Sequence, residues 1–207
     1  MSVTDVSIPE MIEEMGRKAR AAALELQAVA PAKKNAALEL AAGFFNARRE
    51  DIKRENEKDL EAARKNGLSD AMVDRLRLND AGIDGLIRAV REIEALPDPV
   101  GGIENMVMRP NGLRIGHMRA PIGVVGIIFE SRPNVTVDAA ALCFKAGNAA
   151  FLRGGSEAIH SNRVLAEIMN DACREAGLPD GTVQLIPTTD RAAVGAMLKA
   201  DEYIDLI

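Results

Sequence analysis

The stretch PIGVVGIIFESRPNVTVDAAALCFKAGNAAFLRGGSEAIHSN, from Pro121 to Asn162, decides the fold of this chain. Two short apolar runs within it, residues 124–129 and 149–152, are each followed by polar and charged residues. This pattern predicts two strands, each ending in a turn that leads into a helix. We call residues 129–134 the first turn and residues 153–157 the second turn. In a parallel sheet both turns open on the edge where α/β proteins hold ligands.

The rest of the chain after Pro121 continues to alternate between strand and helix patterns. Strands are expected at residues 124–129, 149–152, 183–186 and 203–207, and helices at residues 135–145, 156–176 and 191–198. This alternation predicts a Rossmann-like parallel sheet with helices on its faces. The expected last strand has no helix after it and would leave a buried type of strand as an exposed edge, so we expect the sheet to be incomplete.

The residues before Pro121 form two further parts. Residues 1–100 have apolar residues at helical spacing, which predicts three or four helices. The run ARREDIKRENEKDLEAARK alternates acids and bases, which favours a solvated helix face over a nucleic-acid surface. Residues 101–120 contain two strand-like runs around Pro110-Asn111-Gly112 and are predicted to form a β-hairpin. Residues 121–207 then make the α/β part.

The composition excludes several classes of function. The chain has 207 residues and a net charge of −5, and its 26 basic residues are dispersed, so we expect no nucleic-acid partner. No apolar segment approaches the roughly 20 residues that span a membrane. The first residues lack the pattern of a signal peptide. The cytoplasm is therefore the expected compartment.

The cysteines and histidines do not predict a disulfide or a metal site. Cys143 and Cys173 are thirty positions apart, which fits neither a disulfide framework nor a close pair of ligands. His117 and His160 have no second histidine at zinc-site spacing. Cys143 lies within an amphipathic helical run, so we interpret it as a buried small hydrophobe and not as a nucleophile.

The second turn is the sharpest candidate for a binding site. Gly154 and Gly155 would let the backbone approach an anion, and the free amides of a helix starting at Ser156 and Glu157 would attract it. Arg153 adds planar donors that can engage two phosphate oxygens together, which suits the 2′-phosphate of a phosphorylated dinucleotide. A tight strand-to-helix connection with a serine cap would use the same residues, so both interpretations stay open.

The first turn gathers groups that could take part in chemistry. Glu130, Ser131, Arg132 and Asn134 place a carboxylate, a hydroxyl, a guanidinium and an amide within five positions. Asn134 could donate a hydrogen bond to a developing oxyanion. It could equally be the N-cap of the helix expected from residue 135.

With these residues in view, GIIFESRPNVTVDAAALCFKAGNAAFLRGGSEAIHSN strongly resembles the cofactor domain of the gamma-glutamyl phosphate reductase family. That family is the proline-pathway branch of the aldehyde dehydrogenase superfamily. FESRPNVT, KAGNA and LRGGSEA each resemble this branch more than general aldehyde dehydrogenases, and the likeness extends over the whole chain. The resemblance implies an aldehyde dehydrogenase-like α/β fold. It also implies that the hairpin belongs to the oligomerisation element of a homo-oligomer.

The resemblance implies an activity as well: the NADPH-dependent reduction of L-glutamyl 5-phosphate to L-glutamate 5-semialdehyde and phosphate through a cysteine thioester. Arg153 falls where the superfamily has a basic residue on the adenosine ribose of the cofactor, and Gly154, Gly155, Ser156 and Glu157 fall on its cofactor turn. Asn134 is similar to the oxyanion-hole asparagine, although counting forward from the strand puts Arg132 nearest that position. Glutamate kinase, the enzyme of the preceding step, is a candidate partner.

The resemblance also bears on what this chain can do alone. Members of the family continue well past the position of Ile207 into a catalytic domain that supplies the nucleophilic cysteine, and no residue here matches that cysteine. The 207-residue chain is therefore expected to be inactive by itself. The alternative is an inactive α/β fragment that acts as an interaction or regulatory module.

Overall fold

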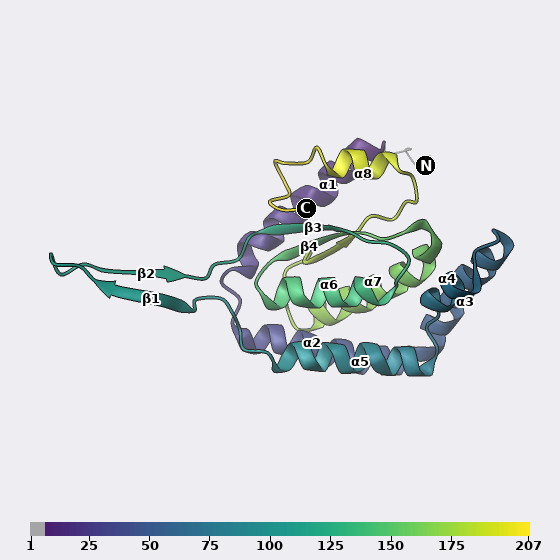
Figure 1. Cartoon of the computed structure of the whole chain (residues 1–207), viewed down its shortest axis with the longest axis horizontal. Coiled ribbons are helices and arrows are strands. Elements are labelled where there is room, and N and C mark those ends of the chain that lie inside the picture. The colour runs from purple at the N-terminus through teal and green to yellow at the C-terminus, as the bar shows by residue number, and fades with distance from the viewer. Residues whose placement is uncertain (1–6) are drawn as a thin grey trace.

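The computed structural model describes residues 7–207, and residues 1–6 of the predicted helical part lie outside the described residues. Helices come first, an antiparallel hairpin follows, and a parallel α/β unit completes the described chain (Figure 1). The fold class predicted from the sequence is confirmed. The elements, in chain order, are α1 (Ile8–Leu26), α2 (Pro31–Ala47), α3 (Arg49–Lys65), α4 (Asp70–Leu76), α5 (Asp80–Ala95), β1 (Ile103–Met108), β2 (Arg114–Met118), β3 (Val124–Ile128), α6 (Asn134–Lys145), β4 (Ala149–Arg153), the 3₁₀ turn η1 (Ser156–Ala158), α7 (Ile159–Glu175), β5 (Val183–Leu185) and α8 (Ala192–Met197).

Two of the helices, α1 and α5, begin at residues whose side chains satisfy free backbone N–H groups. At the start of α1 the Ser7 hydroxyl accepts the Glu10 N–H at 3.4 Å, and the Glu10 carboxylate accepts the Ser7 N–H at 3.0 Å, which is a capping box. Asn79 caps α5 by accepting the Gly82 N–H at 2.9 Å. Five helices occupy this region of the described chain, more than the three or four predicted, because the short α4 forms separately after Gly67.

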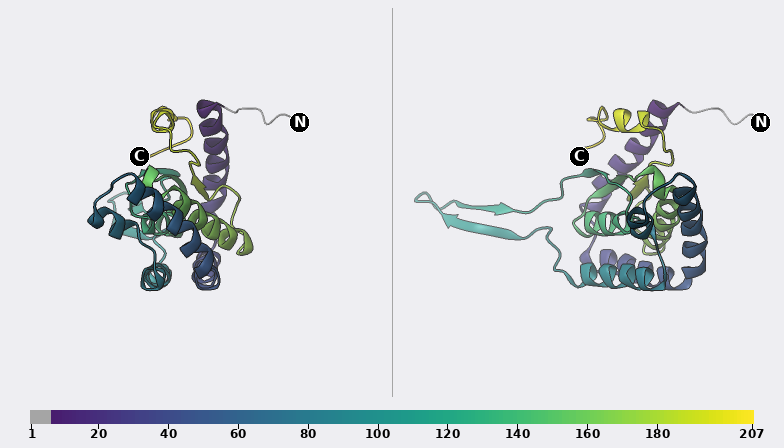
Figure 2. Two further views of the ribbon diagram at one scale, coloured as in Figure 1. Left: turned by 90° about the vertical axis from the view of Figure 1, so that its right-hand side faces the viewer. Right: turned by 45° about the vertical axis from the view of Figure 1, so that its right-hand side comes forward.

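The parallel sheet has β4 at its centre, in the order β3-β4-β5. Val124 pairs with Ala149, and Ala150 pairs with Val183. All five residues of β4 are buried, as expected for a parallel strand covered on both faces. In Figures 1 and 2, α1 and α8 lie over one face of the sheet, and α6 and α7 lie under the other. Helices α2 and α5 form a further layer beneath α6 and α7.

The apolar core has a main part and a small satellite. The main cluster joins the sheet with α1, α2, α5, α6 and α7. The satellite joins α3 and α4 to the turn η1 through Leu60, Ala63, Val73, Leu76 and Ala158. The helices α3 and α4 therefore have their own packing contact with η1, the segment that follows β4.

The strand predicted at residues 203–207 was wrong. Only a single bridge forms there, between Leu206 and Val125. Side-chain contacts supplement a short backbone contact there: the Asp205 carboxylate accepts the Val124 N–H at 2.8 Å and pairs with Arg20 of α1 at 2.7 Å. The Asp205 N–H donates to the Val124 carbonyl at 2.9 Å. The Leu206 carbonyl also accepts the Gly126 N–H at 2.7 Å, so the segment still covers the free edge of β3.

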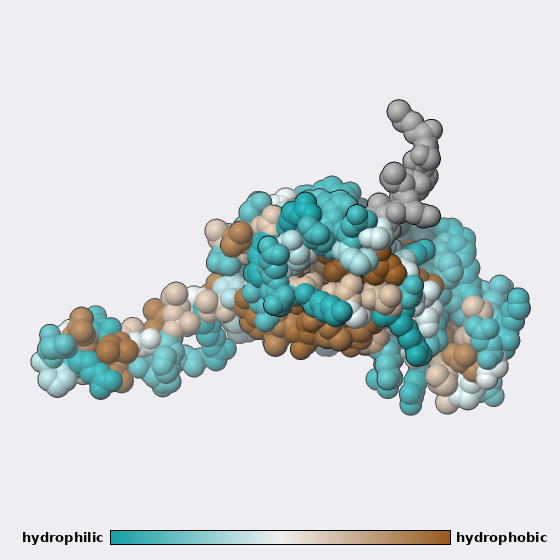
Figure 3. Space-filling view, turned by 90° about the horizontal axis from the view of Figure 1, so that it is seen from above, coloured by the Kyte–Doolittle hydropathy of each residue, from teal (hydrophilic) through white to brown (hydrophobic). Residues whose placement is uncertain are grey.

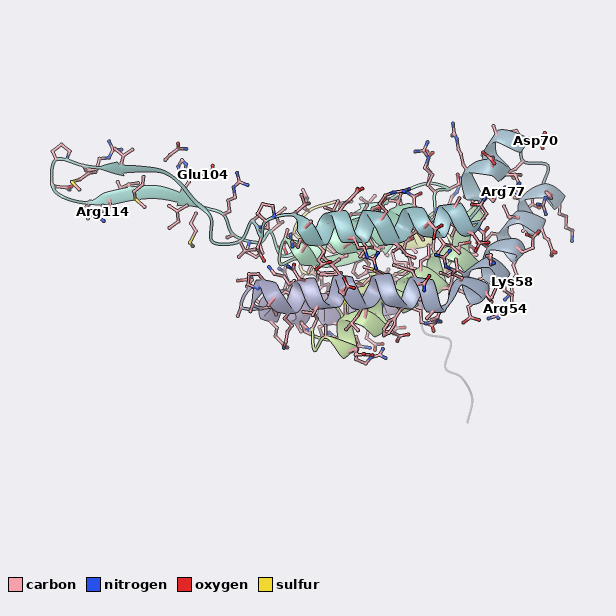
Figure 4. All side chains as sticks on the ribbon, turned by 90° about the horizontal axis from the view of Figure 1, so that it is seen from below. Arg54, Lys58, Asp70, Arg77, Glu104 and Arg114 are labelled. Atoms are coloured by element: carbon pink, nitrogen blue, oxygen red, sulfur yellow. The ribbon has the colours of Figure 1, made fainter. Side chains whose placement is uncertain are left out.

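Strands β1 and β2 form a two-stranded arm that projects from the body (Figure 2). Ile103 pairs with Met118 and Met108 with Arg114, and an irregularity between Glu104 and Val107 interrupts the ladder. Every residue of both strands is exposed. Figure 3 shows apolar atoms near the tip of the arm. In Figure 4, Arg114 lies toward the tip and Glu104 nearer the body, and the whole arm lies at the end opposite Lys58 of α3. No helix in residues 7–207 is long and apolar enough to cross a membrane.

Candidate functional site

The two turns that follow β3 and β4 meet at one hollow of about 810 Å³. Glu130 and Ser131 come from the first turn, and Arg153, Gly155, Ser156 and Glu157 come from the second. The loop before α8 adds Thr189 and Arg191. The remaining wall is mostly apolar, and its side chains are Met72, Ile128, Phe129, Val194 and Leu198. The hollow thus combines a few charged groups with an apolar surface, as small-molecule sites commonly do.

Arg153 brings a positive charge to this hollow from a buried position. It is the last residue of β4, and only 8% of its surface is exposed. Its terminal nitrogens donate to two backbone carbonyls, that of Thr189 at 3.1 Å and that of Gly154. Its buried Nε has no hydrogen-bond partner among the described residues. A buried charge that is met only by neutral carbonyls is costly, and an anion in the hollow would offset that cost.

The two glycines of the second turn permit close packing. A side-chain carbon at Gly154 would collide with Nδ2 of Asn162 and lie 3.1 Å from Cε2 of Phe129. One at Gly155 would lie 2.6 Å from Oε2 of Glu157 and 3.2 Å from the carbonyl carbon of Glu130. Both positions therefore press against the first turn, which ends the neighbouring strand. The glycines hold the two turns side by side at the edge of the hollow.

The helix expected from Ser156 begins later than predicted, and two of its first amides are already bonded. Ser156–Ala158 form a 3₁₀ turn without a side-chain cap, and α7 starts at Ile159. The amides of His160 and Ser161 donate to the carboxylate of Asp59, at 3.2 and 2.7 Å. The predicted start of the helix was therefore three residues too early, and the amides of His160 and Ser161 are not free to attract an anion. Attraction of an anion by the amides of Ser156 and Glu157 stays a prediction.

Sequence reasoning missed Asp59, because the residue lies in the charged run that was interpreted as a solvated helix face. Asn56 and Asp59 are each only 2% exposed, so part of that face of α3 is buried. The sequence did contain a signal for this buried face of α3. Five residues recur at helical spacing, and all of them are buried: Ile52, Asn56, Asp59, Leu60 and Ala63. Nothing in the local pattern, however, indicates a partner 102 residues away.

Asn134 and Arg132 lie outside the lining of the hollow as described. Asn134 is exposed at the start of α6, and its amide donates to the Asp138 carboxylate at 3.1 Å. The N-cap of α6 is Pro133, so the interpretation of Asn134 as the N-cap was wrong. Burial raises the pKa of Asp138, against the opposing effect of the Asn134 hydrogen bond. The structure places Glu130 and Ser131 beside Arg153 instead.

Both cysteines are buried and poorly suited to act as nucleophiles. Burial raises the pKa of the Cys143 thiol to about 11 and that of the Cys173 thiol to about 12. The reactive thiolate is therefore scarce at neutral pH. The interpretation of Cys143 as a small hydrophobe is consistent with this burial. Within residues 7–207, no group of three or more histidine, cysteine, aspartate or glutamate side chains is placed to hold a metal ion.

Comparisons with known proteins agree with this architecture. A sequence model of the aldehyde dehydrogenase family matches residues 4–207. A gamma-glutamyl phosphate reductase from Magnetococcus marinus is 52% identical over 198 residues, which cover 96% of this chain and 47% of that protein. The crystal structure of gamma-glutamyl phosphate reductase from Thermotoga maritima matches with a TM-score of 0.90 at 40% identity, covering 93% of this chain and 47% of that one. For the enzyme from Saccharomyces cerevisiae the TM-score is 0.86 at 32% identity, covering 94% and 50%.

The comparisons confirm the resemblance carried by FESRPNVT, KAGNA and LRGGSEA. The chain spans about half the length of the relatives it matches, 47% in the Magnetococcus marinus protein. The helices, the arm and the incomplete parallel sheet correspond to part of a longer architecture. The chain belongs to the aldehyde dehydrogenase family.

Proposed function

We propose that the hollow between the two turns binds NADPH, and that the protein reduces L-glutamyl 5-phosphate to L-glutamate 5-semialdehyde and phosphate. This would be a step of proline biosynthesis in the cytoplasm. Support for the reaction comes from the similarity to gamma-glutamyl phosphate reductases. Support for the cofactor comes from one observation above all: the buried guanidinium of Arg153 lines the hollow without a carboxylate partner.

The residues of the hollow fit a phosphorylated dinucleotide. Arg153 would contact the 2′-phosphate, since a guanidinium can present two donors to the oxygens of one phosphate. The second turn (Gly154, Gly155, Ser156 and Glu157) would border the adenosine ribose, and Val194 and Leu198 offer an apolar surface for the base. NADPH, when bound, supplies the hydride that reduces the acyl group.

The acyl chemistry requires a nucleophile that the described residues do not offer. Cys143 and Cys173 are buried and their pKa values are raised, so neither suits a thioester mechanism. A thioester would then form on a cysteine outside this chain, and the chain alone would be inactive. Asn134 or Arg132 stays a proposed oxyanion donor, because a catalytic domain could bring substrate to this exposed corner.

The direct test is a titration of the protein with NADPH, followed by the fluorescence of the cofactor. Arg153→Ala should weaken NADPH binding at least about tenfold, which corresponds to about 1.4 kcal/mol. It should change NADH binding far less, since NADH lacks the 2′-phosphate. Arg174→Ala serves as the control, because Arg174 is an exposed arginine of α7 away from the hollow. If NADPH bound equally well to wild type and Arg153→Ala, Arg153 would have no part in the site.

The arm supports a homo-oligomer in the proposed function. Its exposed apolar side chains have no cover within residues 7–207, and large exposed apolar patches commonly mark protein interfaces. Light scattering over a wide concentration range would test this, and a monomer throughout would contradict it. Association with glutamate kinase is a further proposal, which the same arm could serve.

The arm also gives the alternative function its basis: an α/β module that binds a partner and catalyses nothing. The two proposals separate in one pair of measurements. The reductase requires NADPH binding that depends on Arg153. The interaction module requires association through the arm and predicts no cofactor binding at all.

A further inference from the structure

Helix α7 is capped by a carboxylate from a distant helix. Asp59 of α3 accepts three hydrogen bonds there: from the His160 N–H at 3.2 Å, the Ser161 N–H at 2.7 Å and the Ser161 hydroxyl at 2.6 Å. The two segments are about 100 residues apart in the sequence, at a separation of 102 for Ser161. A carboxylate at this position also interacts favourably with the positive end of the helix dipole.

The cap is buried and held by a polar network. Asp59 is 2% exposed and Ser161 is fully buried. Asn56, one turn earlier on α3, donates to the Ser161 hydroxyl at 2.9 Å and to the Leu76 carbonyl at 2.7 Å, and it accepts the Leu78 N–H at 2.8 Å. The Asp59 carboxylate is therefore met by N–H and O–H donors, and no lysine or arginine of the described chain pairs with it.

The same helix α3 also packs against η1, which shares Ser156 and Glu157 with the second turn. Leu60 and Ala63 form the satellite cluster with Ala158, the last residue of η1. The short segment after Arg153 is thus fixed at both ends: β4 holds its beginning, and Asp59 holds the helix that follows it. Figure 1 shows α3 at the end of the molecule opposite the arm, where it packs against α7 and η1.

This arrangement leads to our further inference, which rests on the proposed NADPH site. We propose that Asp59 is a positioning residue for the cofactor: it occupies the N-terminus of α7 and thereby holds the second turn in the conformation that receives the cofactor phosphate. A phosphate that sat on this helix terminus would have to replace a buried carboxylate. The cofactor is therefore held beside the helix, by Arg153 and the turn, and not on its axis.

The test compares three variants in titrations with NADPH and with 2′,5′-ADP, a fragment that reports on the adenosine end alone. Asp59→Ala should weaken the binding of both ligands about tenfold. Without the cap the second turn is less ordered before binding, and ordering it costs part of the binding free energy. Asp59→Asn keeps one acceptor oxygen and should recover most of the affinity. Glu61→Ala is the matched control, an exposed acid two positions along α3, and should bind both ligands like the wild type.

A purely structural role makes a different prediction. Asp59→Ala would then lower the unfolding midpoint while the folded fraction bound both ligands with unchanged affinity, and this result would overturn the inference. In the full-length enzyme, a positioning role predicts a raised KM for NADPH with kcat at saturating NADPH unchanged. An unchanged KM for NADPH would also overturn it.

Two safeguards keep the test decisive. If Asp59→Ala does not fold, Ser161→Ala removes one of the three donors and should weaken 2′,5′-ADP binding by about two- to threefold. A Ser161→Ala variant that bound 2′,5′-ADP as tightly as the wild type would contradict the inference. If the wild type itself bound neither ligand, the proposed NADPH site would fail instead, which is a separate outcome.

Discussion

The arm and the parallel sheet are both made of short strands with apolar residues, yet they lie at opposite extremes of burial. All five residues of β4 are buried, whereas every residue of β1 and β2 is exposed. The sheet is covered on both faces by helices of its own chain, and the arm has no such cover in residues 7–207. An apolar strand pattern therefore predicts extended structure but does not say which molecule covers it. A lone hairpin is marginally stable in water, so an arm of this kind would gain stability from a second surface.

Polar side chains hold the two segments that connect the arm to the body of the molecule. On the outgoing side, the Asp98 carboxylate accepts the Val100 N–H at 2.9 Å and pairs with the buried Lys34 at 2.5 Å. On the returning side, the amide oxygen of Asn148 accepts the N–H groups of Ile122 and Gly123, at 2.6 and 3.0 Å. The arm thus leaves the body in a defined direction even though nothing in the described chain packs against it.

The two regions should differ most in the free energy of unfolding that is lost when a large apolar side chain is replaced by alanine. Phe151→Ala, at the fully buried centre of β4, should lower the free energy of unfolding by about 3–5 kcal/mol. Met108→Ala, at a site that is 63% exposed in β1, should change it by no more than about 0.5 kcal/mol. Denaturant unfolding of dilute protein measures both. Equal costs would show that the arm is packed in the single chain.

A smaller loss is expected at the turn that leads into β4. Gly147 has a φ of +76°, and a side-chain carbon there would lie 2.8 Å from Cγ of Pro121, at the base of the arm. Gly147→Ala should therefore cost about 1–3 kcal/mol from the strained backbone, and more from the collision. Gly43→Ala in α2 is the control, since nothing lies within 4 Å of its added carbon. The control should be neutral or stabilising, because alanine favours helices.

Removal of the returning anchor should cost somewhat less. Asn148→Ala would leave the Ile122 and Gly123 N–H groups without their acceptor, at a cost of about 1–2 kcal/mol. The loss should appear in unfolding experiments and as faster hydrogen exchange of these two amides. Slow exchange retained in the variant would show that another group holds this limb of the arm.

The smallest effect on unfolding is expected within the arm, together with a large effect on assembly. Ile115→Glu, at a site that is 47% exposed in β2, should change the free energy of unfolding of the single chain by no more than about 0.5 kcal/mol. It should also shift light scattering toward the monomer, because it places a charge on the proposed interface. Arg109→Glu in the loop of the arm is the control for charge alone. Unchanged association of Ile115→Glu would place the interface elsewhere.

Local patterns predicted most of the fold. Strands β3 and β4 and helix α6 begin and end within one residue of the expected positions, because short apolar runs are bounded there by glycine and polar residues. The strand predicted at residues 203–207 does not form beyond a single bridge. The Asp205 carboxylate accepts the Val124 N–H, which a backbone carbonyl would accept in a longer ladder. A hydrophobic pattern does not distinguish these two ways of covering the edge of β3.

In the candidate site, too, local sequence predicted some residues and missed those whose role depends on distant contacts. Arg153 could be singled out because its neighbours in the sequence are also its neighbours in the turn. Asp59 could not, because its role depends on contact with a helix about 100 residues later. Asn134 shows the opposite error: its type suited an N-cap, but Pro133 took that place and the Asn134 amide bonds to Asp138.

The contact between Arg20 and Asp205 has a consequence for the order of events during folding. The two residues are 185 positions apart, and Asp205 also satisfies the first N–H of β3. At about 5–20 residues per second, a ribosome takes about 10–40 s to make the chain between them. During that time α1 lacks its partner, and the edge of β3, which begins 81 positions before Asp205, lacks it for about 4–16 s. Such long-range contacts slow folding. Shielding of this edge in the nascent chain would therefore matter most in the interval before Asp205 emerges.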